Sequence, residues 1–347
     1  MKQLRILFFQ PDYSGYREAY YQHQFPMALL KVHQVFMYGP GYQNYDSQHT
    51  ASNVLTLCPF EPDLICFGAG WERSEHPTYF QLHPAINVAD VGIPSVMILN
   101  KEYKKLDQKF QFILNNNIQI VFTAHHNYAR WQEQLGVRFV HFPFAIDQKI
   151  FKNYGEPKRY DFGFSGMLLT RWIDLRLRIK HKLFWGGRIR RLRYRNLQMY
   201  WTELDNNQKR EKNYYRLLNS RRMWLSTTND ADRKWGEEYS RLINSSRIWL
   251  STTSAADLVG TRFFEVMASK SLLFCNRSLV YDGLFKDGKH CVMFDPNLSD
   301  FDDKLFYYLK NQEESQSIIE QAYRHVHENH TWIKRVEQFT KVVERFL

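Results

Sequence analysis

Cysteine is scarce in this sequence, and long apolar runs are missing. The 347 residues include four cysteines, at positions 58, 66, 275 and 291, with neither a Cys-x-x-Cys pair nor zinc-finger spacing. Neither a disulfide framework nor a metal site is indicated. No apolar run approaches the ~18 residues that cross a bilayer, and the first run is too short for the core of a signal peptide. We therefore expect a soluble, cytoplasmic protein that is at most attached to a membrane surface.

The start of the chain also lacks a glycine-rich dinucleotide fingerprint. The first apolar run ends in Gln10-Pro11-Asp12 rather than in a Gly-x-Gly-x-x-Gly loop. Nucleotide-sugar epimerases and dehydrogenases need that loop after their first strand. Enzymes of this class are therefore disfavoured.

Negative charge is in deficit, with 36 Asp and Glu against 47 Lys and Arg, a net charge of +11. Such an excess favours an anionic partner, and nucleotide phosphates, anionic lipid headgroups and nucleic acid all qualify. Ten of the basic residues gather in residues 171–195, interleaved with leucine and isoleucine. This segment is either a solvated helix face with an exposed loop or a surface that attracts phosphate or an anionic membrane.

Short apolar runs recur along the first half of the chain and are separated by helical or loop segments. They lie at residues 4–9, 33–38, 64–67, 95–99, 118–122 and 137–142. Brief runs rich in Ile, Val and Phe are typical of buried parallel strands. Because plausible helices alternate with them, for example at 101–115 and 126–135, the pattern predicts an open α/β sheet.

A polar stretch at residues 147–158 predicts a domain boundary, and a chain of this length fits two domains. After it, a strand at 160–164 runs into Ser165-Gly166, as at the opening of a second α/β domain. We predict an N-terminal domain over residues 1–150, a C-terminal domain over 151–325 and an amphipathic final helix within 326–347, capped by His330-Thr331.

The second half contains an internal repeat, in which residues 216–232 recur as 241–257. Each copy predicts the end of a helix, a short strand and a polar loop. Two copies are too few for a solenoid. We interpret the repeat as a local duplication in which the second copy keeps the original place, because the strongest motif follows it directly.

That motif leads from Asp257 through a polar loop with Gly260 and Thr261 into a helix that carries Arg262 and Glu265. A helix N-terminus offers backbone N–H groups and a positive dipole to a diphosphate. Arg262, in the first turn, can add a charge-assisted hydrogen bond. Glu265 can accept both hydroxyls of a ribose, as carboxylates do in other nucleotide-binding folds. The alternative for Glu265 is a helix-surface carboxylate paired with Lys or Arg.

This region resembles the donor-binding segment of GT-B glycosyltransferases. In detail it is similar to the spore-maturation (CgeB-like) branch of the group 1, retaining-type families, whose Arg-x-Phe-Glu-like motif and Ala-rich helix are matched by Arg262, Phe264, Glu265 and Ala268. The Glu-x7-Glu spacing of the wider superfamily survives as Asp257 and Glu265, with Asp in the first place. The glycine that usually follows the alanine is replaced by Ser269-Lys270.

The resemblance implies two Rossmann-like domains that face each other across a cleft, with the C-terminal helix crossing back. It implies an enzyme that moves a sugar from a nucleotide-sugar donor, a UDP- or GDP-sugar, to a glycan, lipid, protein or other acceptor. Transfer would retain the anomeric configuration, with no metal bridging the phosphates and no resident cofactor. The residues implied to contact the donor are Ser165, Gly166, Arg171, Gly260, Thr261, Arg262 and Glu265.

Three residues are candidates for catalysis. His125 and His126 follow the strand at 118–122, where the end of a parallel strand meets a cleft, and one of them could assist the acceptor hydroxyl. They could equally be polar loop residues. Asp257 takes the place of the sugar-contacting Glu in the superfamily motif.

A second class of function is a polyanion- or nucleic-acid-binding protein on an inactive transferase-like fold. The basic segment 171–195, with Trp185, Tyr194 and Tyr200 close by, motivates it. Such a protein binds nucleic acid with a steep salt dependence, whereas a transferase binds a specific nucleotide at moderate salt. We favour the transferase, with the basic segment as a possible contact to an anionic membrane surface.

Overall fold

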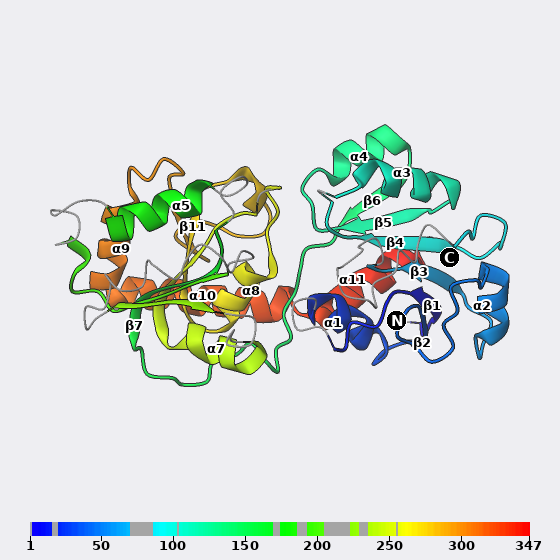
Figure 1. Ribbon diagram of the computed structural model, residues 1–347, viewed down its shortest axis with the longest axis horizontal. Coiled ribbons are helices and arrows are strands. Elements are labelled where there is room, and N and C mark those ends of the chain that lie inside the picture. The colour runs from blue at the N-terminus through cyan, green and yellow to red at the C-terminus, as the bar shows by residue number, and fades with distance from the viewer. Residues whose placement is uncertain are drawn as a thin grey trace. The chain divides into compact units, whose positions relative to one another are not determined.

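The computed structural model describes residues 2–15, 20–69, 86–102, 104–168, 174–185, 193–204, 223–228, 235–254 and 256–347. The chain forms two compact units, Met1–Ala145 with Thr331–Leu347, and Ile146–His330. Each unit contains a parallel sheet for which six strands are described, with helices packed on it (Figure 1). The α/β fold with two parallel sheets that the sequence predicts is therefore confirmed.

The sheet of the N-terminal unit has the strand order β2-β1-β3-β4-β5-β6. Its strands are β1 (Arg5–Phe9), β2 (Gln34–Tyr38), β3 (Leu64–Phe67), β4 (Ser95–Leu99), β5 (Ile120–Thr123) and β6 (Arg138–His141). The helices described between them are α1 (Tyr20–Leu29), α2 (Ala51–Leu57), α3 (Leu106–Asn115) and α4 (Tyr128–Leu135).

Both faces of the central part of this sheet are buried, which is why β3, β4 and β5 appear in the sequence as unbroken apolar runs. Successive side chains of a strand point to opposite faces. Leu7 and Phe9 of β1 accordingly pack with side chains of α2, α3 and α4. Ile6 and Phe8 pack with side chains of α1 and of the last helix, α11 (Trp332–Glu344).

The last helix belongs to the core of the N-terminal unit. Thr331 caps it as predicted, because its side chain accepts a hydrogen bond from the Lys334 N–H. Val336 and Phe339 are fully buried against the sheet. The buried Arg335 donates a hydrogen bond to the Pro143 carbonyl at 2.6 Å, which fixes the chain just after β6.

The sheet of the C-terminal unit has the order β12-β11-β10-β7-β8-β9. Its strands are β7 (Tyr160–Met167), β8 (Met199–Leu204), β9 (Met223–Thr228), β10 (Ser246–Ser251), β11 (Leu272–Asn276) and β12 (Val292–Phe294). The described helices are α5 (Asp174–Lys180), a π-helical turn (His181–Trp185), α7 (Gly236–Asn244), α8 (Thr261–Ala268), a 3-10 turn (Leu279–Tyr281), α9 (Phe301–Lys310) and α10 (Gln312–Asn329).

The two copies of the repeat contribute strands to the same sheet. The second copy ends α7 and forms β10, which lies between β11 and β7. The described part of the first copy is β9, which pairs with β8 at the sheet edge. The second copy leads directly into the loop before α8, so it holds the position next to the motif.

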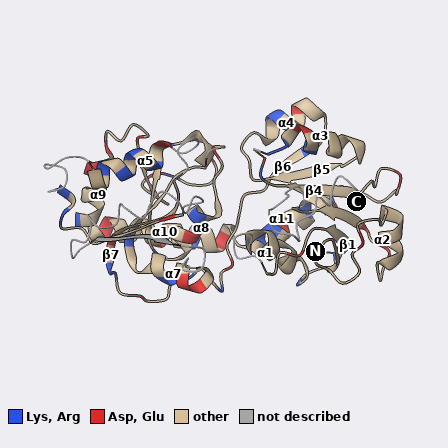
Figure 2. Cartoon of the chain, viewed as in Figure 1, with Lys and Arg blue, Asp and Glu red and all other residues tan. Residues whose placement is uncertain are grey.

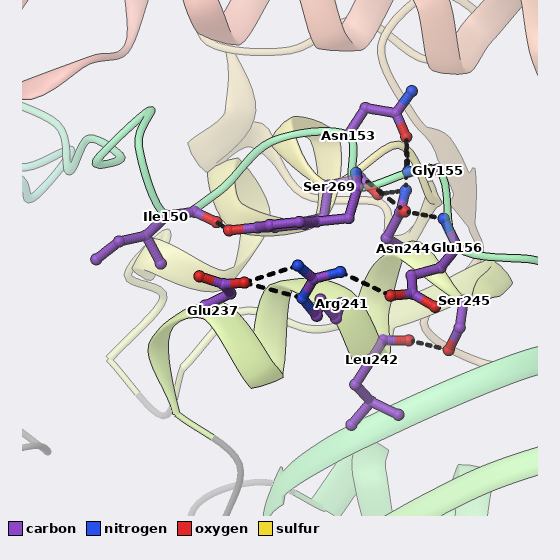
Figure 3. A network of polar contacts seen from close by, with 11 residues as sticks. Ile150, Asn153, Gly155, Glu156, Glu237, Arg241, Leu242, Asn244, Ser245 and Ser269 are labelled. Atoms are coloured by element: carbon purple, nitrogen blue, oxygen red, sulfur yellow. Dashed lines mark hydrogen bonds and ion pairs between the residues drawn. The ribbon is translucent and has the colours of Figure 1, made fainter.

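A network of hydrogen bonds and an ion pair connects Tyr154 and Glu156, near the start of the C-terminal unit, to α7 (Figure 3). The Asn244 side chain accepts hydrogen bonds from the N–H groups of Tyr154 and Glu156, at 3.2 and 3.0 Å, and donates to the Ser269 carbonyl at 2.8 Å. Arg241 pairs with Glu156 and lies over the Tyr154 ring, 4.1 Å from its centroid. Arg241 and Asn244, which the repeat carries, thus have a structural role in this copy.

One predicted boundary is wrong in a way that bears on function. The strand expected at 160–164 continues to Met167. Ser165 and Gly166 therefore lie within β7, paired with Thr202 and Glu203 of β8, and not in a loop after it. The strand continues because β8 offers partners for these residues.

Among the helices that the structure describes, none is long and apolar enough to span a membrane.

Candidate functional site

The C-terminal unit has a point where the order of its strands reverses. The chain passes from β7 to β8 and β9 on one side, and β10 then lies on the other side of β7. In open α/β sheets, ligands bind outside the carboxyl ends of the strands at such a point. Gly166 lies near the carboxyl end of β7, and Thr252 directly follows β10.

Two arginines meet at this place, Arg176 of α5 and Arg262 of α8. Gly166 makes room for them, because a Cβ atom there would lie 2.8 Å from Nη1 of Arg262 and 3.5 Å from Nη1 of Arg176. Arg176 is buried and donates from Nε to the Thr252 hydroxyl at 2.7 Å and from Nη2 to the Thr252 carbonyl at 3.3 Å. Burial, and then the neighbouring charge of Arg262, lower the pKa of Arg176.

Arg262 has hydrogen-bonding capacity to spare. Its Nε is buried and makes no hydrogen bond to any described residue, and its guanidinium lies 5.8 Å from the ring centroid of Tyr239. The Tyr239 hydroxyl is likewise buried with no hydrogen-bond partner within the described part of the chain. Buried polar groups are normally paired, and two adjacent guanidinium groups repel each other. Two adjacent guanidinium groups with an unused donor could hold an anion.

Glu265 is buried, not on the helix surface. It is 3% exposed, and its Oε1 accepts no hydrogen bond from the residues that the structure describes. Burial raises the pKa of Glu265 to about 8. The side chain lies one turn beyond Arg262 on α8, a helix whose remaining residues from Phe263 to Ala268 are also buried. The alternative of a surface carboxylate paired with Lys or Arg is therefore wrong.

The loop before α8 supplies space and one exposed carboxylate. Gly260 is the N-cap of α8, and a Cβ atom added there would meet nothing within 4 Å. Thr261 begins the helix. Asp257 is exposed and adopts a left-handed backbone conformation with φ 51°. Burial is the main cause that raises the pKa of Tyr281. The charge of Asp257 raises this pKa further and the charge of Arg176 lowers it, so Asp257 and Arg176 both lie near the Tyr281 hydroxyl.

The other predicted site residues fall in three places. Ser165 is buried in β7 next to Gly166, while Arg171 lies outside the described residues. His125 and His126 lie in the N-terminal unit, just after β5. His125 is buried: its N–H donates to the Thr123 hydroxyl at 3.1 Å, and its ring stacks on His126 with 4.4 Å between centroids. His126 is exposed.

Sequence reasoning missed Arg176, Thr252 and Tyr239. Arg176 was hidden among the ten basic residues of 171–195, where Arg171 seemed better placed. A signal did exist: Arg176 shares one helix face with Ile179 and Leu183, both of which are buried. A charged residue on the apolar face of a helix is a candidate for function, because burying it is costly unless a partner or ligand compensates.

The described part of the basic segment is largely neutralised. Arg178 pairs with Asp174, Lys180 with Glu203, and Lys182 and Arg193 both with Asp302, at 2.7–3.2 Å. Figure 2 shows the basic positions of α5 and the acidic start of α9 that take part. These contacts fit a solvated helix face.

Among the residues with described positions, no cluster of three or more His, Cys, Asp or Glu side chains could hold a metal ion.

Comparison with known proteins shows what the chain is similar to. Residues 184–341 match the model of a family described as glycosyl transferase-like. No curated protein matches the sequence. Three similar structures are HepE from Anabaena in complex with UDP and glucose, sucrose-phosphate synthase from Thermosynechococcus elongatus and a glycosyltransferase from Rickettsia africae.

The similarity to these structures extends over whole chains. HepE is 14% identical, with 99% of this chain and 100% of HepE covered and a TM-score of 0.60. The synthase is 9% identical, with 99% of each chain covered and a TM-score of 0.63. The Rickettsia enzyme is 13% identical, with 99% of each chain covered and a TM-score of 0.58. The chain therefore has the GT-B fold of these structures, and its residues 184–341 are similar to a glycosyl transferase-like family.

Proposed function

We propose that the chain transfers a sugar from a UDP-sugar to an acceptor hydroxyl and binds the donor diphosphate at Arg176 and Arg262. The observation that carries this proposal is the pair of arginines beside Gly166, at the reversal point of the C-terminal sheet. HepE, with the same fold, is known in complexes with UDP and with UDP-glucose. That likeness favours uridine over guanosine for the base.

In this reaction Arg176 and Arg262 would stabilise negative charge on the leaving diphosphate. The bond between the anomeric carbon and the diphosphate oxygen breaks, and its electron pair stays on the departing UDP. The acceptor oxygen forms the new bond to that carbon and loses its proton to a base or to water. Two fixed guanidinium groups stabilise the charge that grows on the diphosphate. We propose that they do so without a bridging metal ion.

The remaining predicted residues complete the proposal. Glu265 would accept the ribose hydroxyls, which would satisfy its unpaired Oε1. The N-terminus of α8, at Gly260 and Thr261, would offer backbone N–H groups to the diphosphate, and Ser165 and Arg171 would lie near the donor. Asp257 would contact the sugar, and His125 or His126 would assist the acceptor. We also predict that the transfer retains the anomeric configuration and that the chain belongs to the CgeB-like branch. A cytoplasmic location, and a contact of residues 171–195 with an anionic membrane, are further predictions.

The test is titration calorimetry of UDP and GDP with the full chain and with Arg176→Met and Arg262→Met, with and without magnesium. Loss of a charge-assisted hydrogen bond corresponds to about 1.5–3 kcal/mol, so we expect roughly 10- to 150-fold weaker UDP binding by each variant. Arg178→Met is the matched control, because Arg178 is a half-exposed arginine of the same helix that pairs with Asp174. Unchanged UDP affinity in both variants would show that the diphosphate binds elsewhere.

A further inference from the structure

The short helix α5 is tied to the sheet at two points, one on each side of β7. Arg176 donates hydrogen bonds to the hydroxyl and the carbonyl of Thr252, directly after β10. Lys180, one helical turn further on, donates from Nζ to Oε2 of Glu203 in β8 at 2.7 Å. Because β10 and β8 are the two neighbours of β7, these contacts hold α5 across the strand that contains Gly166.

The ion pair between Lys180 and Glu203 is shielded from water, unlike the pair between Arg178 and Asp174 on the same helix. The side chains of Lys180 and Glu203 are 19% and 7% exposed, whereas those of Arg178 and Asp174 are 46% and 72% exposed. The other carboxylate oxygen of Glu203, Oε1, accepts a hydrogen bond from Nε1 of Trp201 at 2.7 Å. Both oxygens of Glu203 are therefore held, and the carboxylate offers Lys180 a fixed point on the sheet.

A buried ion pair contributes little net stability, because the desolvation of both charges offsets their attraction. Its best-attested use is to select one arrangement among several of similar energy. The helix α5 has seven residues, too few to be stable by itself, and a π-helical turn follows it directly. Ile179 and Leu183 pack it onto the core, but apolar contacts are non-directional and leave its rotation and shift open.

We propose that the Lys180–Glu203 ion pair is a positioning element that holds Arg176 in place for the donor diphosphate. This inference rests on the proposed binding of a UDP-sugar at Arg176 and Arg262. Gly166 pairs in register with Glu203, and a Cβ atom at Gly166 would lie 3.5 Å from Nη1 of Arg176. The anchor and the guanidinium group thus meet the sheet at neighbouring positions. Groups that bind a ligand need supporting contacts that hold them to within about 0.5 Å, so release of Lys180 should displace Arg176.

The test is a double-mutant cycle of Lys180→Met and Arg176→Met with UDP affinity as the readout, measured by calorimetry and, for the weakest binding, by saturation-transfer NMR. We expect Lys180→Met alone to weaken UDP binding roughly tenfold, a coupling of the size found within one network. In the Arg176→Met background, Lys180→Met should have no further effect. Lys180→Arg keeps the charge and should restore most of the affinity. Arg178→Met, which removes the exposed ion pair of the same helix, is the matched control and should bind UDP normally.

Glu203→Gln is a milder companion variant, because it keeps the size of the side chain, and it should weaken UDP binding in the same Arg176-dependent way. Melting curves of each variant show whether it is folded at the assay temperature. Two results would overturn the proposal: UDP affinity unchanged in both Lys180→Met and Glu203→Gln, or affinity lowered equally with and without Arg176. If Arg176→Met still lowers UDP affinity in either case, only the positioning role is lost. UDP affinity unchanged by Arg176→Met would remove the donor site at Arg176, and this inference with it.

Discussion

Replacement of Glu265 by glutamine is expected to give a protein whose stability advantage over the wild type grows as the pH rises. Glu265 is 3% exposed, and its Oε1 is buried with no hydrogen-bond partner in the described residues. Burial raises the pKa of Glu265 from 4.5 to about 8. The folded chain therefore keeps a proton that the unfolded chain has released between these two pH values.

The sign and size follow from proton linkage. Because the folded state binds more protons in this window, the free energy of unfolding of the wild type falls as the pH rises from 4.5 to about 8, and then levels off. Each tenfold difference in proton affinity corresponds to 1.36 kcal/mol, so the loss at pH 7 is about 3 kcal/mol. Glutamine has nearly the same shape and cannot ionise, so the variant lacks this loss. For a domain of this size the difference amounts to roughly 6–12 °C in Tm.

The assay is a series of thermal melts of the ligand-free chain across that pH window. Glu328→Gln, at an exposed position of α10, is the matched control and is expected to follow the wild type. The Tm difference between Glu265→Gln and the wild type should widen steadily towards pH 8. A difference that stays constant across the window would refute the reasoning, because it would mean that Glu265 titrates alike in both states.

Three further predictions follow from particular contacts. Gly166→Ala brings a Cβ atom within 2.8 Å of Arg262 Nη1 and is expected to weaken UDP binding roughly tenfold by calorimetry. Gly15→Ala is the control, because a Cβ atom at Gly15 meets open space. Unchanged UDP affinity of Gly166→Ala would contradict the placement of Arg262. Asn244→Ala removes the network of Figure 3 and should lower the free energy of unfolding by about 1–3 kcal/mol in urea, whereas Asn329→Ala at an exposed helix end should not. Phe339→Ala, in the buried face of α11, should cost about 3–5 kcal/mol by the same measurement, whereas Lys341→Ala on the exposed face should have little effect. Equal effects in that last pair would show that α11 is not part of the core.

The fold was largely predictable because the central strands of both sheets are buried on both faces. Residues 64–67 and 95–99 match β3 and β4, since an unbroken apolar run leaves little doubt about where a central strand begins and ends. The end of β7 was not predictable. Ser165 and Gly166 look like turn residues, but β8 pairs with them, and pairing with a strand remote in sequence leaves no local signal.

The candidate site was predictable only where one short segment carries it. Gly260, Arg262 and Glu265 lie on or next to α8, so the motif found them together. Arg176 comes from a different helix and meets Arg262 only after the sheet has formed. The burial of Glu265 was not predicted, although the residues around it on α8 are apolar and are themselves buried. In the N-terminal unit the sequence placed His125 and His126 at a strand end, but which side chains from the other strands gather there depends on the strand order, which leaves no local signal.

The measurement that tests the central claim most directly is release of UDP from UDP-sugars by the purified full chain, with water as the acceptor. We predict that UDP is released from at least one UDP-sugar and that the rate falls by at least roughly 100-fold in Arg176→Met and in Arg262→Met, while Arg178→Met keeps it. Release of UDP that is equally fast in both site variants, or no release from any UDP-sugar by a folded chain that binds UDP, would contradict glycosyl transfer at this pair of arginines.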